Sequence, residues 1–513
     1  MRSSPILVCQ SPLLHSESIN YNIPVGKTLT EFVKRHWDTI ILTLLISVYT
    51  VVLATLSVRR HNAFASLFDL ANMDQTLWYT LNGHFFQFRL PDDFVSRFSV
   101  HADILLILLS PLYIIWNDVR ALLVSSSFFL ALGAIPVFLL SRTLLGRKIP
   151  ALILALAYLL NPGVQWTNIY DFHAVSLAIP LLLAAFYCAH AKRWRWYAVW
   201  TILAILTKED ISLNIAMMGL MIALVYKERV VGVITFLLGI AWFFSMVTVV
   251  MPYFSPNNIH WALDKMTGSV ENPLAQTISR YTDPRVLIST FITNPKTIEY
   301  YTLLLKQFAY VPILGLPWLL LGAPALAINV IRDTTSITFH YDSGVIPALV
   351  IATIYGFYYL KRILMLIPLQ KSLRVGVMTV FMLLFITAVS RVNYHYSPLP
   401  TTPSCSCYIY NVTDEDREFE KKLQSIPKDA SITASLEIRP HVSHRELAFT
   451  LPSATESATY IAMITQNRII SDYDEKTYEK ELIADLKSKP DQFEILHASE
   501  HFYLFKRRLQ VDL

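Results

Sequence analysis

The chain has 513 residues, of which 54% are hydrophobic and 16% are charged, and its formal net charge is +5. The charged share is well below the roughly 25% of soluble domains, and the mean hydropathy is +0.43. These values exclude an ordinary soluble enzyme and predict a protein that crosses the membrane several times. In such a protein Lys and Arg mainly report orientation, so we expect membrane lipids and no nucleic acid as partners.

The first 36 residues are largely polar, and an uncharged run follows over residues 40–58. That run is about long enough to cross ~30 Å of hydrocarbon, and no signal-peptide core precedes it. Lys27, Lys34 and Arg35 come before the run. The positive-inside rule therefore predicts a cytoplasmic tail over residues 1–36 and an extracytoplasmic loop after the first span.

Apolar runs alternate with short basic clusters up to residue 390, which predicts a transmembrane domain over residues 37–390 with outer loops at 59–101 and 252–299. Pro312, Pro317 and Pro324 divide the stretch 300–331, and broken helices in a membrane need protein or water around them. The short run 102–116 either crosses or lies in the outer interface. The other predicted segments are 121–140, 149–160, 175–191, 196–207, 211–226, 230–251, 344–360 and 375–389.

Composition changes sharply after a Pro-rich linker at 391–403. An odd number of crossings places residues 404–513 outside the membrane, where alternating patterns predict a small soluble α/β domain able to fold alone. The predicted helices are 413–425 and 476–489, and the predicted strands are 431–434, 447–451, 460–463, 493–497 and 502–506. A glycosylation sequon at 411–413 is consistent with an outer location. Cys405 and Cys407 are too close in sequence for a relaxed disulfide.

The first outer loop carries a helical pattern over residues 67–81, in which Leu70, Met73 and Leu77 fall on one stripe. Asp69 and Asp74 flank that stripe on opposite sides. An acidic amphipathic helix just outside a span is expected to lie flat on the membrane. The two carboxylates are the candidate catalytic residues, because few other charges surround them.

Further polar clusters are predicted at the same outer face. The turn at 208–210 joins two short apolar runs, so its charges should lie close to hydrocarbon, where charges are costly and usually functional. A purely structural role is equally open, in which Lys208 pairs with Glu209 or Asp210 and stabilises the turn. His101 and His173 each begin an apolar run, so each could simply cap a helix. The candidate substrate-binding residues are His101, Asp171, His173, Lys208, Glu209, Asp210, Arg332, His340 and Tyr341.

This set of side chains suits glycosyl transfer from a lipid-phosphate sugar. A carboxylate can take the proton of the acceptor, and cations such as Lys208 or Arg332 can stabilise the leaving phosphate. Asp69 and Asp74 could alternatively hold Mg²⁺ or Mn²⁺ through oxygen ligands. They lack a DxD spacing, so we expect weak metal dependence and name no certain cofactor.

Several stretches resemble a family of prokaryotic membrane proteins, domain-of-unknown-function family 2079. They are FDLANMDQTLWYTLNGHFF, SVHADILLILLSPLYIIW, NIYDFHAVSLAIPLLL, LTKEDISL and HYDSGVIPAL, spread over roughly residues 64–360. The family looks like a branch of the GT-C glycosyltransferases. The resemblance implies a GT-C-like helical fold, a polyprenyl-phosphate-linked sugar donor, and Asp69 before Asp74 as the catalytic carboxylate. The chain departs from the family at Ala174 and Val175, where Pro and Glu are expected.

Two other functions remain open from the sequence. Broken helices and charges near hydrocarbon also fit a transporter or flippase of a lipid-linked or anionic solute. A catalytically inactive scaffold with a binding domain outside is the third interpretation. For a cell-envelope transferase the acceptor would be a glycan, a lipid or a protein, and the outer domain would position it. His441 and His444 could contact an anionic acceptor there or belong to a solvated loop.

Overall fold

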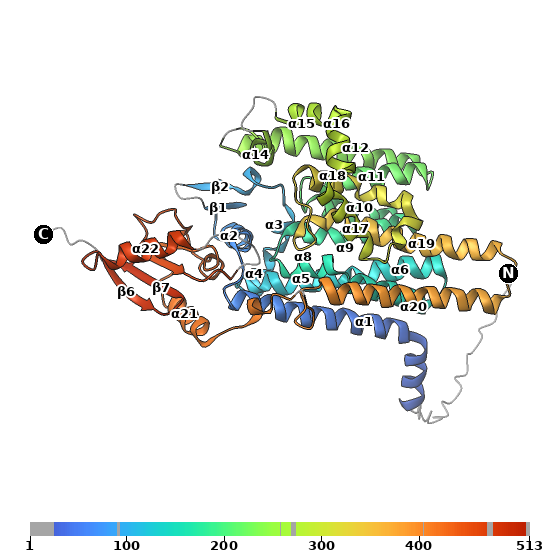
Figure 1. Cartoon of the computed structure of the whole chain (residues 1–513), viewed down its shortest axis with the longest axis horizontal. Coiled ribbons are helices and arrows are strands. Elements are labelled where there is room, and N and C mark those ends of the chain that lie inside the picture. Colours follow the sequence, from blue (N-terminus) through green and yellow to red (C-terminus); the bar gives the residue numbers. More distant parts are fainter. Residues whose placement is uncertain are drawn as a thin grey trace, which may run out of the picture.

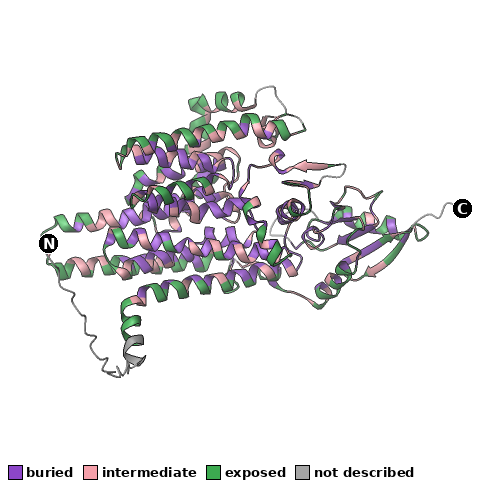
Figure 2. Ribbon diagram, turned by 180° about the vertical axis from the view of Figure 1, so that it is seen from behind, coloured by how far each residue is buried: buried purple, intermediate pink, exposed green. Residues whose placement is uncertain are grey.

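Two regions make up the molecule in a computed structural model that describes residues 25–89, 93–256, 258–267, 273–403, 405–468 and 476–508. Helices gather at one end, and a small sheet domain lies at the other (Figure 1). The predicted fold class, a helical polytopic membrane protein with a C-terminal α/β domain, is confirmed. Burial concentrates inside the helical region, and its outer helices keep exposed faces (Figure 2).

Among the described residues, six helical stretches are long and apolar enough to cross a membrane, and a seventh is counted if one bent pair forms a single span. The bent pair is α7 (Lys148–Leu159) and α8 (Pro162–Ile169), which meet at 43°. Asn161 causes the break, because its side chain accepts a hydrogen bond from the Val164 amide and caps α8. The six are Thr30–Asn62, Arg120–Leu145, Arg229–Phe254, Val311–Ile331, Ile346–Leu366 and Lys371–Tyr396.

Short apolar helices fill the interior between these spans. They include α9 (Ala178–His190) and α11 (Ile211–Leu224), whereas α10 (Trp194–Ile205) lies at the surface with Trp196 and Ile202 exposed. α11 packs closely on α12 (Arg229–Ser245), because a Cβ on Gly219 would come within 2.5 Å of the Phe236 backbone nitrogen. Small residues permit such close backbone contact between helices in membranes. The predicted run 102–116 becomes α3 (Leu105–Leu109) and α4 (Pro111–Ile115), which end too soon to cross.

The broken character predicted for residues 300–331 is confirmed. The stretch consists of α17 (Pro295–Lys306), the 3-10 helix η5 (Val311–Gly322) and α18 (Ala323–Ile331). η5 packs on α19 (Ile346–Leu366), where a Cβ on Gly315 would come within 2.1 Å of the Ala352 carbonyl oxygen. Protein therefore covers the irregular backbone, as a membrane requires.

Two predicted boundaries and one predicted loop differ from the structure. Helix α1 (Val25–Asn62) begins inside the predicted tail, and α20 (Lys371–Tyr396) extends into the predicted linker. Most of the described part of the second outer loop is helical. Helices as short as these obtain their stability from packing, so hydropathy alone does not reveal them. They are α13 (Met251–Phe254), α14 (Trp261–Thr267), α15 (Pro273–Thr282), α16 (Pro284–Leu287) and the π-helix η4 (Ile288–Ile292).

The C-terminal domain contains a five-stranded sheet of order β4-β3-β5-β7-β6. Strands β4, β3 and β5 are parallel, whereas β7 is antiparallel to β5 and β6. The predicted strands and helices are confirmed to within one or two residues. They are β3 (Ile432–Ala434), β4 (Ala448–Thr450), β5 (Tyr460–Ile464), β6 (Phe493–Ala498), β7 (Phe502–Arg507), α21 (Asp414–Gln424) and α22 (Thr477–Lys487).

The two regions share one core at their junction. Phe64, just after α1, is fully buried and belongs to the apolar cluster formed by the C-terminal domain. Its ring lies 4.9 Å from that of Phe502 and is stacked at 4.0 Å on His441. Arg468 donates to the Ala63 carbonyl oxygen at 3.0 Å. The C-terminal domain is therefore fixed to the end of the first membrane span.

Helix α2 (Phe68–Leu81) confirms the helix predicted at 67–81, but it does not lie flat on the membrane. Its apolar stripe packs on protein, since Leu70, Met73 and Leu77 join a cluster with Leu106 and Phe172. Its other side contacts the 3-10 helix η8 (Arg439–His441) of the C-terminal domain. Protein on both sides removes the surface that a lipid-facing helix would need.

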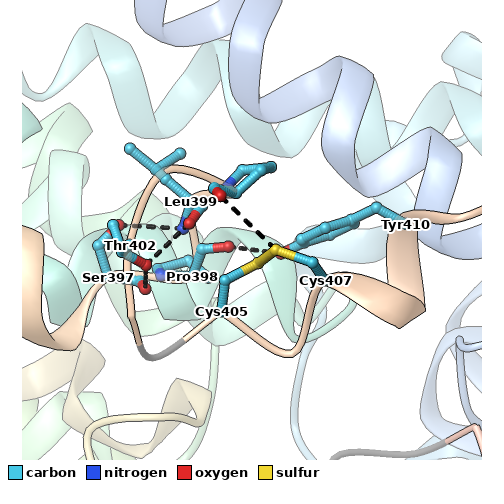
Figure 3. Close-up of a disulfide and its surroundings, with 8 residues drawn as sticks. Ser397, Pro398, Leu399, Thr402, Cys405, Cys407 and Tyr410 are labelled. Atoms are coloured by element: carbon cyan, nitrogen blue, oxygen red, sulfur yellow. Dashed lines mark hydrogen bonds between the residues drawn. A yellow bond between two sulfur atoms is a disulfide. The ribbon is translucent and has the colours of Figure 1, made fainter.

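Cys405 and Cys407 form a disulfide, contrary to the sequence-based expectation (Figure 3). The pair lies in the short connection between α20 and α21. The Tyr410 hydroxyl donates to the Pro398 carbonyl oxygen at 3.0 Å, and Thr402 bonds the Ser397 carbonyl oxygen at 2.7 Å. These bonds fold the connection into a tight loop that brings the two cysteines together.

Candidate functional site

A cavity of about 570 Å³ opens at the end of the helical bundle nearest the C-terminal domain. Its walls come from the start of α2, the turn between α10 and α11, helix α14 and the segment between α18 and α19. Seven of the eleven predicted site residues line this one cavity: Asp69, His101, His173, Lys208, Arg332, His340 and Tyr341.

Asp69 lies in the first turn of α2, where the helix dipole favours a negative charge. Its side chain is 49% exposed, and one oxygen lies 3.4 Å from His173 Nε2. Burial acts to raise the pKa of Asp69, but the hydrogen bond and charge of His173, with Arg97 and His101, together hold that pKa below its ordinary value. Asp69 is therefore an ionised carboxylate with an accessible oxygen at neutral pH.

The start of α2 is held in place by Asp171. This carboxylate accepts from the Leu67 amide at 3.0 Å and pairs with Arg60 at 2.5 Å. Asp171 is buried and has a backbone φ of +127°, which is costly for a residue other than glycine. It does not line the cavity, so its place is behind the helix that carries Asp69.

Histidine and tyrosine rings form one wall of the cavity. The rings of His173 and His340 are stacked at 3.7 Å, and His340 lies 4.5 Å from Tyr341. Burial, together with the charges of His173 and Lys208, lowers the pKa of His340 well below its ordinary value. His340 is therefore neutral, and it is the hydrogen bond and charge of His173 that favour an ionised Asp69.

The turn between α10 and α11 contributes a cation, Lys208, and a carboxylate, Glu209, that holds His101 in place. Lys208 Nζ lies 3.0 Å from Asp210, which confirms that the turn contains an ion pair. Glu209 instead turns toward His101, at 3.0 Å from its Nδ1, and accepts from the Ala102 amide at 3.1 Å. Burial acts to raise the pKa of Glu209, but His101 and Lys208 outweigh it and leave that pKa well below its ordinary value. Glu209 therefore fixes His101 at the cavity edge.

Arg332 completes the cationic side of the cavity. Its guanidinium lies 5.6 Å from the Trp261 ring, a cation–π contact. Trp261 in turn donates to the Val100 carbonyl oxygen, which ties α14 to the first outer loop. Trp261, Asp264 and Lys265 of α14 line the cavity and were not predicted from the sequence. A tryptophan followed three residues later by an acid in a polar outer loop was the available signal.

Asp74 lies in a different environment from Asp69. It is fully buried, and its oxygens accept from Tyr113 and Ser443 and approach His444 Nε2 at 2.8 Å. The two carboxylates are five positions apart on α2, so they point about 140° away from each other. They do not form one ligand set for a metal ion. Within the described ranges, no three His, Cys, Asp or Glu side chains are grouped to hold a metal.

His441 and His444 do not belong to a solvated loop, because both contact the membrane domain. His441 is stacked between His61 and Phe64 and bonds Glu420 at 2.6 Å. Arg439 is buried and donates to Gln75 of α2 at 3.0 Å. The sequence left this segment open as an anion contact or a solvated loop, and in the structure it contacts α2.

Comparison with known proteins finds a matching sequence family and similar solved structures, among them two of the same protein. Residues 60–494 match the family described as predicted membrane protein, DUF2079. ArnT from Cupriavidus metallidurans bound to undecaprenyl phosphate has 11% sequence identity and a TM-score of 0.47, covering 91% of this chain and 98% of that chain. The apo state of the same protein has 12% identity, a TM-score of 0.46 and the same coverage. No curated protein matches this chain.

Proposed function

The chain belongs to the DUF2079 family of predicted membrane proteins, and we propose that it is a membrane-embedded glycosyltransferase. It would transfer a sugar from a polyprenyl-phosphate-linked donor to an acceptor at the outer face of the membrane. The observation that carries the proposal is the pairing of an accessible carboxylate, Asp69, with two cations, Lys208 and Arg332, around one cavity.

The cavity has the parts that an inverting transfer needs. Asp69 removes the proton from an acceptor hydroxyl, and the freed oxygen attacks the anomeric carbon of the sugar. The bond between that carbon and the phosphate oxygen breaks, and polyprenyl phosphate departs with the electron pair. Lys208 and Arg332 stabilise the charge that develops on the phosphate. His173 keeps Asp69 ionised before the proton is taken.

The orientation of the chain follows the same proposal. Lys192, Arg193, Lys227, Lys361 and Arg362 lie at the end of the bundle remote from the sheet domain, and the positive-inside rule places that end in the cytoplasm. The disulfide between Cys405 and Cys407 supports an oxidising compartment for the other end. The cavity and the C-terminal domain would then both be extracytoplasmic.

The test replaces Asp69 with Asn in the full chain, reconstituted in liposomes with a panel of polyprenyl-phosphate hexoses and pentoses. The measurement is release of polyprenyl phosphate in the presence of an acceptor mixture. Asp69→Asn is nearly isosteric, so we expect normal folding and a loss of at least about a hundredfold in rate. Asp93→Asn is the matched control, because Asp93 is exposed in the same outer loop and does not line the cavity.

Equal rates for Asp69→Asn and the unaltered chain would remove Asp69 from the mechanism. Failure of the unaltered chain to release polyprenyl phosphate from any donor would contradict the transferase itself.

A further inference from the structure

A second cavity, of about 830 Å³, lies at the end of the bundle remote from Asp69. It is bounded by Trp37 of α1, the start of α7, the end of α19 and the first three turns of α20. We propose that this cavity binds one anionic diacyl phospholipid, with the phosphate among its basic side chains and the acyl chains along its apolar wall.

The charge of the lining is one-sided. Five basic side chains and no acidic one line the cavity: Arg147, Lys148, Lys361, Lys371 and Arg374. Lys148 is paired with Asp38 at 2.7 Å, and Lys361 donates to the Leu145 carbonyl oxygen at 3.0 Å. Arg147, Lys371 and Arg374 form no ion pair with any described residue. The buried Nε of Arg374 also has no hydrogen-bond partner there. An anion would satisfy these groups.

The apolar part of the lining continues from the basic part along α20. Lys371, Arg374, Met378 and Met382 recur at helical spacing, so they share one face of the helix. The basic residues lie in its first turn and the methionines one to three turns further along. Ile153 of α7 extends the apolar wall opposite. A headgroup phosphate at the mouth with chains running inward matches this order of side chains.

Basic residues at this end of a membrane protein usually only set orientation. Lys192 is an example of such a residue, since it is exposed and paired with Glu228 at 2.6 Å. The cavity differs because its cations border an apolar space of about 830 Å³, a volume typical for bound ligands. Basic pockets between membrane helices bind anionic lipid headgroups for the same reason. Guanidinium groups such as those of Arg147 and Arg374 suit a phosphate because they can bond two oxygens at once.

The experiment measures lipid retention by native mass spectrometry of the full chain in detergent. Phosphatidylglycerol, phosphatidylcholine of equal chain length and undecaprenyl phosphate are each titrated. We expect one phosphatidylglycerol to bind more tightly than the other two lipids. Each cation near an anionic lipid contributes about fivefold in affinity, so Arg147→Gln with Lys371→Gln and Arg374→Gln should weaken that binding on the order of a hundredfold. Arg195→Gln, an exposed cation at the same end of the bundle, should leave it unchanged.

A second pair of variants keeps every cation. Thr379→Trp fills the apolar part of the cavity, whereas Val380→Trp, the adjacent lipid-facing position, does not. We expect only the former to weaken phosphatidylglycerol binding. Equal phosphatidylglycerol binding by the two Trp variants, or unchanged binding by the triple Gln variant, would indicate a diffuse attraction to the surface. Either result would contradict the proposed site. Equal or tighter binding of undecaprenyl phosphate would overturn its assignment to a phospholipid. None of these readouts depends on transferase activity.

Discussion

Asp69 differs from the neighbouring carboxylates in how few partners it has. Asp74, Asp171 and Glu209 are buried, and each is bonded by two or more groups. Asp69 is half-exposed and contacts His173 at 3.4 Å. Carboxylates with every oxygen occupied support the fold, and only a carboxylate with a free oxygen can accept a proton from a bound substrate.

His173 should influence the pH dependence of transfer. The His173 hydrogen bond and charge help to hold the pKa of Asp69 below its ordinary value of 3.8. In His173→Gln that lowering is lost, so the pKa of Asp69 rises and protonated, inactive enzyme appears at higher pH. We expect the acid limb of kcat/KM to move toward neutral pH, with kcat reduced about tenfold. The control is His84→Gln, since His84 is stacked on Phe94 outside the cavity. An unmoved acid limb would limit His173 to a packing role.

The candidate site could be predicted only in part from the sequence. Asp69, His173 and Lys208 were identifiable because charge is rare next to apolar runs. The partners of Asp74 were not, because Ser443 and His444 lie 369 and 370 residues further along the chain. No local pattern encodes a contact at that separation. The contact of Arg439 with Gln75, 364 positions apart, was unpredictable for the same reason.

Helix α2 depends on the C-terminal domain through Asp74. Removing one member of a buried polar cluster leaves the others without partners, which costs about 3 kcal/mol. Asp74→Ala should therefore loosen α2, and transfer should fall by less than in Asp69→Asn. Hydrogen exchange over residues 68–81 measures the loosening.

Ser443→Ala and His444→Gln test the same contact from the other side. Each should raise exchange in α2 although neither residue is on that helix. Unchanged exchange in all three variants would show that α2 is held by its apolar stripe alone.

At the scale of the element, hydropathy and periodicity predicted most helices and every strand of the C-terminal domain. The short strand Ile432–Ala434 was predictable because its flanking turns are polar and its residues are apolar or β-branched. The helix at 261–267 was not, since it is polar and is held by Trp261 reaching the first outer loop. Tertiary contacts decide such short helices, and the sequence contains no direct record of them.

The two regions of the molecule should separate when Phe64 is removed. Truncating a buried Phe costs about 3–5 kcal/mol, so Phe64→Ala should undock the C-terminal domain. Limited proteolysis between α20 and α21 and a lower Tm for the full chain measure the effect. Phe85→Ala is the control, because Phe85 is 64% exposed. Identical cleavage rates for both variants would contradict a shared core.

The proposed orientation of the whole chain is tested at Ser488, which is exposed after α22. In a Cys9→Ser background, Ser488→Cys should react with an impermeant maleimide in intact cells. Cys188 is buried and the other two cysteines form a disulfide, so background labelling should be low. Labelling that appears only after lysis would place the domain in the cytoplasm and reverse the topology.

The contact between Arg468 and Ala63 also sets an order of assembly during synthesis. Its two residues are 405 positions apart, which a ribosome covers in roughly 20–80 s at ~5–20 residues per second. Throughout that interval the later spans are inserted, while Phe64 and the Asp74 side of α2 lack their contacts with the C-terminal domain. The side of α2 that carries Asp74 and Gln75 is thus covered last, by the final quarter of the polypeptide, and a ribosome that stops early leaves an inserted bundle whose first outer helix is still uncovered.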